Sequence, residues 1–167
     1  MRCRLVGSEM CIRDRFMAGI RDPILVSTID EFISACRQRT ARDVAALGIA
    51  GDDYTLNIQV YGRNAVMGIN EPIKESAAHE LAVLVDVVAL SEDISKAVCA
   101  KARYSLLHTD FPGRMCISGN LAIPFSPSDI PAGTVYEFNI WHTMTCSDPM
   151  EPVRLAFLTP GSPETSS

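Results

Sequence analysis

The sequence lacks most of the patterns that would identify a reaction. It contains no G-x-G-x-x-G motif, no P-loop, no G-x-S-x-G and no H-E-x-x-H, so no phosphate loop, nucleophile elbow or zinc-protease helix is indicated. No apolar run approaches the roughly 18–20 residues of a membrane span. Basic residues are too few for a nucleic-acid or anionic-membrane surface, because the formal net charge is −5. We therefore expect neither nucleic acid nor a membrane as a partner.

Metal and disulfide patterns are also missing. The histidines, His79, His108 and His142, are far apart in the sequence and show no metal-ligand spacing. The six cysteines include no C-x-x-C pair and are too sparse for a disulfide framework. These features predict no metal site, identify no cofactor and favour a reducing cytoplasmic location.

The first 15 residues differ in character from the rest. From Leu5 onward they resemble an in-frame translation of a transposon-end adapter used to build sequencing libraries. The alternatives are a signal peptide and a real N-terminal arm. A signal peptide is disfavoured, because Leu5-Val6 is followed by Gly, Ser and Glu rather than by an apolar core. We expect residues 1–15 to be a non-native leader, 16–158 to be a single domain from the C-terminal part of a longer protein, and 159–167 to be a disordered tail.

The remaining chain, with 47% hydrophobic and 21% charged residues overall, is typical of a globular domain. Periodicity and end signals predict a helix over 22–48, a half-buried strand over 52–60, a central strand covered on both faces over 79–90, a helix over 91–108, a structured loop over 124–133 and a strand over 134–145. This order predicts an α+β two-layer sandwich, in which two main helices cover one face of a small, mostly antiparallel sheet.

The predicted strands also expose a polar and aromatic face. Its members would be Asn57, Gln59, Tyr61, Glu137, Asn139 and Trp141. This face either packs against another part of the protein or is an ordinary solvated face. Asp86 lies in the apolar central strand, so we expect it to have a charged partner or a raised pKa and a function.

Candidate site residues come from two loops and the last predicted strand. The Tyr61–Gly68 turn offers Arg63 and Asn64, and the segment after the second helix offers Arg114 and Asn120, which together suit a carboxylate ligand. His142, His108 and Glu137 are the candidates for proton transfer. A structural role is the alternative for each histidine, and the end of a helix is already a sufficient reason for His108.

Several phrases resemble the C-terminal part of the acyclic terpene utilisation (AtuA) family. They are Gly-Ile-Arg-Asp-Pro (19–23), Tyr-Gly-Arg-Asn-Ala-Val-Met-Gly (61–68), Glu-Pro (71–72), His-Glu-Leu (79–81), Leu-Leu-His (106–108), Pro-Gly-Arg (112–114), Gly-Asn-Leu-Ala-Ile-Pro-Phe-Ser-Pro-Ser-Asp (119–129) and Tyr-Glu-Phe (136–138). The 119–129 phrase is the most specific of them.

The resemblance implies a catabolic protein that acts on acyclic terpenoids or on other small organic acids or acyl thioesters. It implies no particular catalytic residue. Two functions follow: a domain that completes a catalytic site, or a non-catalytic assembly or capping domain. The expected partner is the missing N-terminal domain of the same protein, and a homo-oligomer is the other arrangement that we consider.

Overall fold

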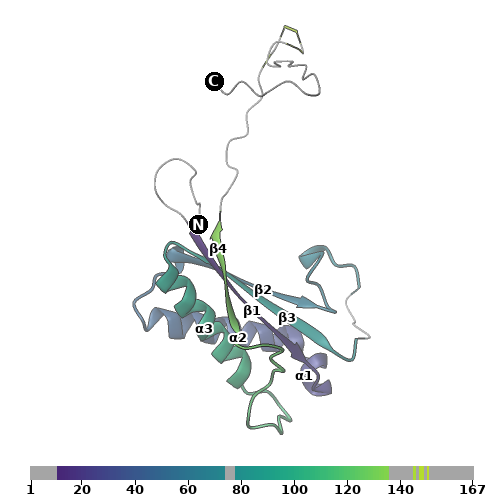
Figure 1. Cartoon of the computed structure of the whole chain (residues 1–167). Coiled ribbons are helices and arrows are strands. Elements are labelled where there is room, and N and C mark those ends of the chain that lie inside the picture. Colours follow the sequence, from purple (N-terminus) through teal and green to yellow (C-terminus); the bar gives the residue numbers. More distant parts are fainter. Residues whose placement is uncertain (1–10, 74–77, 136–144, 146, 149, 151–167) are drawn as a thin grey trace, which may run out of the picture.

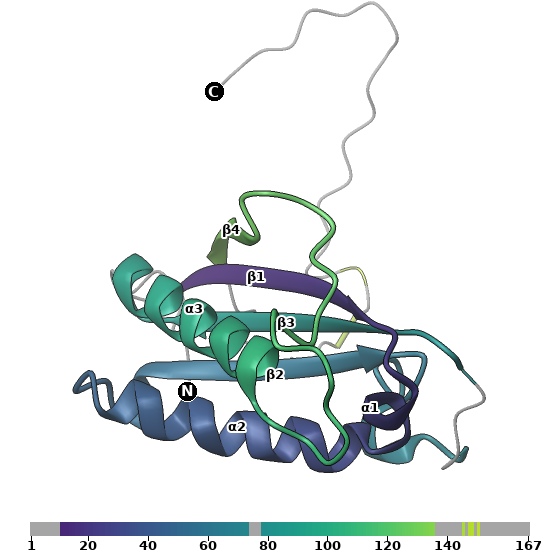
Figure 2. The ribbon, with the colours of Figure 1, turned by 90° about the horizontal axis from the view of Figure 1, so that it is seen from below.

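A computed structural model describes residues 11–73, 78–135, 145, 147–148 and 150 of the chain. Its elements are β1 (Cys11–Ile20), α1 (Pro23–Ser27), α2 (Ile29–Ala45), a 3-10 turn (Gly51–Asp53), β2 (Tyr54–Tyr61), a second 3-10 turn (Gly68–Asn70), β3 (Leu81–Ala89), α3 (Glu92–His108) and β4 (Asp129–Val135). The four strands form an antiparallel sheet, and α2 and α3 cover one face of it (Figures 1 and 2). The predicted α+β sandwich with two main helices is confirmed.

The strand order is β2-β3-β1-β4. β1 and β2 both pair antiparallel with β3, so they are parallel to each other and α2 crosses between them. In the same way β3 and β4 both pair antiparallel with β1, and α3 connects them. Two βαβ units are therefore interleaved, which is the split βαβ arrangement called ferredoxin-like. It leaves one sheet face without helices, here called the open face.

β1 is a strand that the sequence prediction missed, because residues 1–15 were set aside as a leader. Its side chains alternate: Phe16, Ala18 and Ile20 are buried beneath the helices, whereas Met17 is 41% exposed on the open face. Leader residues 11–15 belong to this strand. Their proposed origin in an adapter stays a prediction, but they take part in the sheet.

The first helix begins as predicted but is divided in two. Asp22 caps it, since its carboxylate accepts hydrogen bonds from the backbone N–H groups of Ile24 and Leu25, and Pro23 occupies the first helical position. The backbone then leaves helical geometry at Thr28, and α2 starts at the next residue. α3 is capped by Ser91, as predicted, since the Ser91 hydroxyl accepts a hydrogen bond from the backbone N–H of Ile94.

β3 is central, but the prediction that both its faces are covered is wrong. The burial alternates along the whole strand: Leu81, Val83, Val85, Val87 and Ala89 are buried, and the residues between them are half-buried on the open face. Small and β-branched residues occur on both faces of this strand, so composition alone did not reveal the alternation.

The predicted loop over 124–133 is also partly wrong, because β4 begins at Asp129. β4 is an edge strand that contains Pro131, and its register with β1 shifts between Arg13 and Asp14. A proline is tolerated at a sheet edge, where its missing N–H breaks no ladder bond, and beside a bulge. The predicted strand over 134–145 lies outside the described residues after Val135.

At the other edge of the sheet, the outward carbonyl groups of β2 are occupied by the Arg37 side chain and by the turn that follows the strand. Alternate residues of an edge strand direct their carbonyl groups away from the sheet. The Arg37 guanidinium, from α2, donates to the carbonyl oxygens of Leu56 (3.2 Å) and Ile58 (3.0 Å). The Val60 carbonyl accepts backbone N–H groups from the turn at 63–65. Three successive outward acceptors are thus occupied, which hinders pairing with another strand.

Replacing Arg37 with methionine should open this edge. Two hydrogen bonds from a charged donor disappear, so we expect the free energy of unfolding to fall by about 2 kcal/mol and self-association to increase. Urea denaturation and sedimentation velocity measure the two effects. Arg42→Met is the matched control, since Arg42 pairs only on the surface with Asp43 and its loss should change stability by less than about 0.5 kcal/mol. Equal effects of the two variants would contradict the edge role of Arg37.

Asp14 is a charged residue at a buried position of β1. It is 2% exposed and its Oδ2 atom has no hydrogen-bond partner among the described residues. A buried carboxylate in that situation carries an uncompensated desolvation cost.

Asp14→Val should therefore stabilise the chain, by about 1–2 kcal/mol, since valine also suits a buried strand position. Thermal and urea denaturation would show the gain. Asp52→Val, at an exposed position, is the control and should be nearly neutral. A loss of stability in Asp14→Val would show that the carboxylate has a favourable role.

Candidate functional site

The loops that supply the candidate residues meet at one end of the sheet. This is the end where β1 and β2 finish and β3 begins, and α1 and the segment that follows α3 lie there too (Figure 1). Arg63, Asn64, His108, Arg114 and Asn120 belong to this end. His142 and Glu137 lie outside the described residues, so their predicted convergence with the others is not tested.

Arg63 is engaged within the fold. Its guanidinium donates to the Asp30 carboxylate from Nη2 at 2.8 Å and from Nε at 3.3 Å. The hydrogen bond with Asp30 raises the pKa of Arg63 above its ordinary value. This contact ties the turn after β2 to the first turn of α2. An anionic ligand at Arg63 would have to share or displace Asp30.

Asn120 completes the C-terminal end of α3. Its side-chain amide donates to the carbonyl oxygens of Leu106 (3.2 Å) and Thr109 (2.8 Å), and its backbone N–H donates to Leu107 (3.0 Å). These are acceptors that a helix end leaves without partners. The geometry therefore gives the amide nitrogen of Asn120 a structural role, whereas its buried Oδ1 atom has no hydrogen-bond partner among the described residues.

The rest of the 119–129 phrase has comparable structural tasks. Gly119 has a φ of +149°, and a Cβ there would lie 2.9 Å from a methyl carbon of Leu107. Ala122 exchanges two backbone hydrogen bonds with Gly19, at 2.8 and 2.9 Å, and so extends the pairing along the β1 edge. Asp129 accepts a hydrogen bond from Arg103 of α3 at 2.8 Å. The phrase fastens α3, β1 and β4 together.

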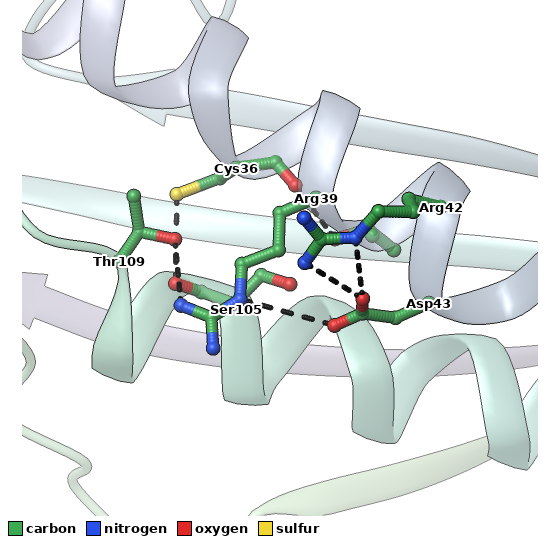
Figure 3. Close-up of polar contacts among 7 residues, drawn as sticks. Cys36, Arg39, Arg42, Asp43, Ser105 and Thr109 are labelled. Atoms are coloured by element: carbon green, nitrogen blue, oxygen red, sulfur yellow. Dashed lines mark hydrogen bonds and ion pairs between the residues drawn. The ribbon is translucent and has the colours of Figure 1, made fainter.

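His108 lies at the seam between α2 and α3. Its ring is stacked at a tilt on Tyr104, with centroids 4.8 Å apart, and the Arg39 guanidinium lies 5.1 Å from the Tyr104 ring centre. Arg39 also contacts Thr109 and Asp43, and Figure 3 shows Thr109 next to the Cys36 thiol and Asp43 next to Arg42. Arg39 thus joins α2 to the end of α3, whereas the contact of His108 with Tyr104 lies within α3 itself.

The cysteines divide by environment. Burial raises the pKa of Cys36 to about 11 and that of Cys99 to about 12, so both thiols are unreactive near neutral pH. Cys116 is exposed, and hydrogen bonds from Ser118 lower its pKa. Cys11 is disulfide-bonded. The free thiols of Cys36, Cys99 and Cys116 fit the predicted reducing compartment, whereas the disulfide at Cys11 does not.

Asp86, the acidic residue singled out in the central strand, is paired. Asp86 lies on the open face and forms ion pairs with Arg15 (2.7 Å) and Arg13 (3.4 Å), which confirms the expected partner.

Arg114 pairs only distantly with Asp110, at 3.9 Å, beside a shallow hollow formed by residues 110–114. Among the described residues no group of three or more metal-binding side chains is assembled.

A cavity of about 600 Å³ lies at the same end of the molecule, partly on the open face. It is lined by Met17, Ala18, Gly19, Ile20, Arg21, Tyr61, Gly62, Glu80, Leu81, Ala82, Ala122, Ile123 and Pro124. The predicted site residues that the structure describes, Arg63, Asn64, His108, Arg114 and Asn120, are not among its lining residues. The sequence signal that could have located it is the alternation of β1, in which Met17, Gly19 and Arg21 share one face.

Comparisons with protein-family models, curated proteins and solved structures found no match. The resemblance to the AtuA family therefore rests on the phrases themselves. The structure adds that most of these phrases lie around one end of the sheet.

Asn120→Ala should destabilise the chain by about 1–3 kcal/mol, because it leaves two helix-end carbonyl groups without their donor. Asn57→Ala, at an exposed position of β2, is the matched control and should be close to neutral. Urea denaturation compares the two. A neutral Asn120→Ala would remove the structural explanation and restore Asn120 as a free ligand-binding group.

Proposed function

We propose that the chain is the C-terminal domain of an AtuA-like catabolic protein and that it serves there as an assembly domain. The observation that supports this most is how the candidate polar groups are used. Arg63 pairs with Asp30, Asn120 caps α3 and His108 packs on Tyr104. The ion pair of Arg63 and the amide hydrogen bonds of Asn120 hold the domain together, so these two groups would have to leave their partners before they could bind a ligand.

The open face supports a docking role. The helices cover the opposite face, and the two edges are obstructed by Arg37 and by the proline and bulge of β4. The open face instead presents half-buried Leu84 and Val88 and the partly exposed Met17 and Tyr61, the last two at 41% and 44%. The same face also carries the ion pairs of Asp86 with Arg13 and Arg15, and a mixed apolar and charged surface is the usual composition of an interface between protein layers.

The partner that we propose is the N-terminal part of the same protein, and the whole protein would act in the cytoplasm on acyclic terpenoids or other small organic acids or acyl thioesters. A homo-oligomer formed through the same face is the competing arrangement. Among the described residues no helix is long and apolar enough to cross a membrane. The acidic net charge of −5 also disfavours a nucleic-acid partner.

The test begins with recovery of the intact gene. The upstream part and this domain are expressed separately, and their binding is measured by calorimetry. We expect Leu84→Glu to weaken binding at least about tenfold, since a charge would be desolvated at the interface. Gln38→Glu adds the same charge on α2 and should leave binding intact. A monomeric domain that does not bind the upstream part would reject the proposal.

The enzymatic alternative is tested in the complete protein. If this domain supplies proton-transfer groups, His108→Ala and His142→Ala should reduce kcat by about 10²–10⁴-fold. Activity that survives both substitutions supports the assembly role, whereas a loss with unchanged stability contradicts it.

A further inference from the structure

The cavity at the end of the open face has the composition of a small-molecule site. Four chain segments form it: the end of β1 at 17–21, the facing ends of β2 and β3 at 61–62 and 80–82, and residues 122–124. Most of its lining is apolar, with one cation and one anion at Arg21 and Glu80. A concave, mainly apolar site with a few polar groups is the usual form of a ligand pocket.

Its walls are fixed by the backbone. Residues 122–124 are held against β1 by the two hydrogen bonds between Ala122 and Gly19. On the opposite side Gly62 has a φ of +89°, and a Cβ there would lie 2.9 Å from Leu81 and 3.3 Å from the carbonyl oxygen of Glu80. The absence of a side chain at Gly62 lets the two strand ends approach. The cavity is therefore a consequence of the fold.

Arg21 is the polar group best placed to hold a ligand. Its backbone lies between the last residue of β1 and Asp22, which is fixed by capping α1. Its only ion pair among the described residues is with Glu80, with Nε 3.6 Å from Oε1. Both side chains are more than 60% exposed, so this pair is weak. Much of the guanidinium's donor capacity remains available to a planar anion.

We infer that this cavity binds a small carboxylic acid with an apolar chain. The carboxylate accepts hydrogen bonds from Arg21, and the chain lies on Met17, Ala82 and Ile123. Glu80 competes with the ligand for Arg21, so it limits the affinity. This site goes beyond the proposed docking role. Met17 and Tyr61 belong to both surfaces, so a partner docked on the open face would cover part of the cavity, and the site is tested on this chain alone.

Because Glu80 competes with the ligand for Arg21, substitutions at these two residues should change the affinity for octanoate in opposite directions. Octanoate is titrated into the full chain, and binding is followed by calorimetry and by amide shifts of Gly19, Ala82 and Ala122 in NMR spectra. Arg21→Met, which keeps an apolar stem, should weaken binding about tenfold. Glu80→Gln should strengthen it several-fold, since it removes the competing charge. Ala82→Phe should abolish binding by filling the cavity.

Controls separate this site from general adsorption. Arg42→Met removes a surface cation on α2 and should leave octanoate binding unchanged. Octylamine and octanol have the same chain without the carboxylate and should bind much more weakly. Equal binding of the three probes, or octanoate binding that survives both Arg21→Met and Ala82→Phe, would overturn the inference. The titration contains no upstream domain, so its result is independent of the docking experiment.

Discussion

The pairing of β1 with β3 is the constraint on which the other features depend. The two strands are matched residue by residue from Ile12–Ala89 to Ile20–Leu81 in the middle of the sheet. β1 also pairs with β4 and with Ala122 on its other side. Each βαβ crossover spans one of these two central strands. Without β1, α3 would lose one of the two strands on which it mainly packs, and the 119–129 segment would have no edge to follow.

This dependence explains which parts of the fold could be predicted from sequence. β2 has a clear alternation and α3 has a helical period and an N-cap, so the predicted ends of both elements agree with the structure within one or two residues. The two-layer class follows from those elements. β1 has an equally clear alternation at 16–20, but the leader-like residues before it hid the strand. β4 was partly missed because Pro131 is a loop signal except at an edge, and only the sheet order identifies an edge.

Asp14 shows that the sheet tolerates a local conflict. In a chain whose local and global preferences agree, a buried strand position beneath a helix is apolar. Asp14 departs from this rule, since one of its carboxylate oxygens is buried without a hydrogen-bond partner among the described residues. Arg15 and Arg13 do pair with Asp86, so a favourable and an unfavourable contact occur within the same few residues. Such conflicts are not confined to β1, because the hydroxyl groups of Ser95 and Ser105 in α3 are also buried without a hydrogen-bond partner in the described part of the chain.

The candidate site was harder to predict than the fold, and the reason is physical. Arginine and asparagine suit ligand carboxylates, but they suit Asp30 and helix-end carbonyl groups equally well. Their partners here are 33 residues away for Arg63 and 11 or 14 for Asn120, a relation that local patterns do not contain. The contacts of the 119–129 phrase hold the fold together and also shape the cavity. Asn120 and Ala122 fasten the segment to α3 and β1, and that attachment places Ile123 and Pro124 on the wall of the cavity. A structural explanation of the phrase therefore does not compete with a binding function, because the same hydrogen bonds that hold the segment also shape the site.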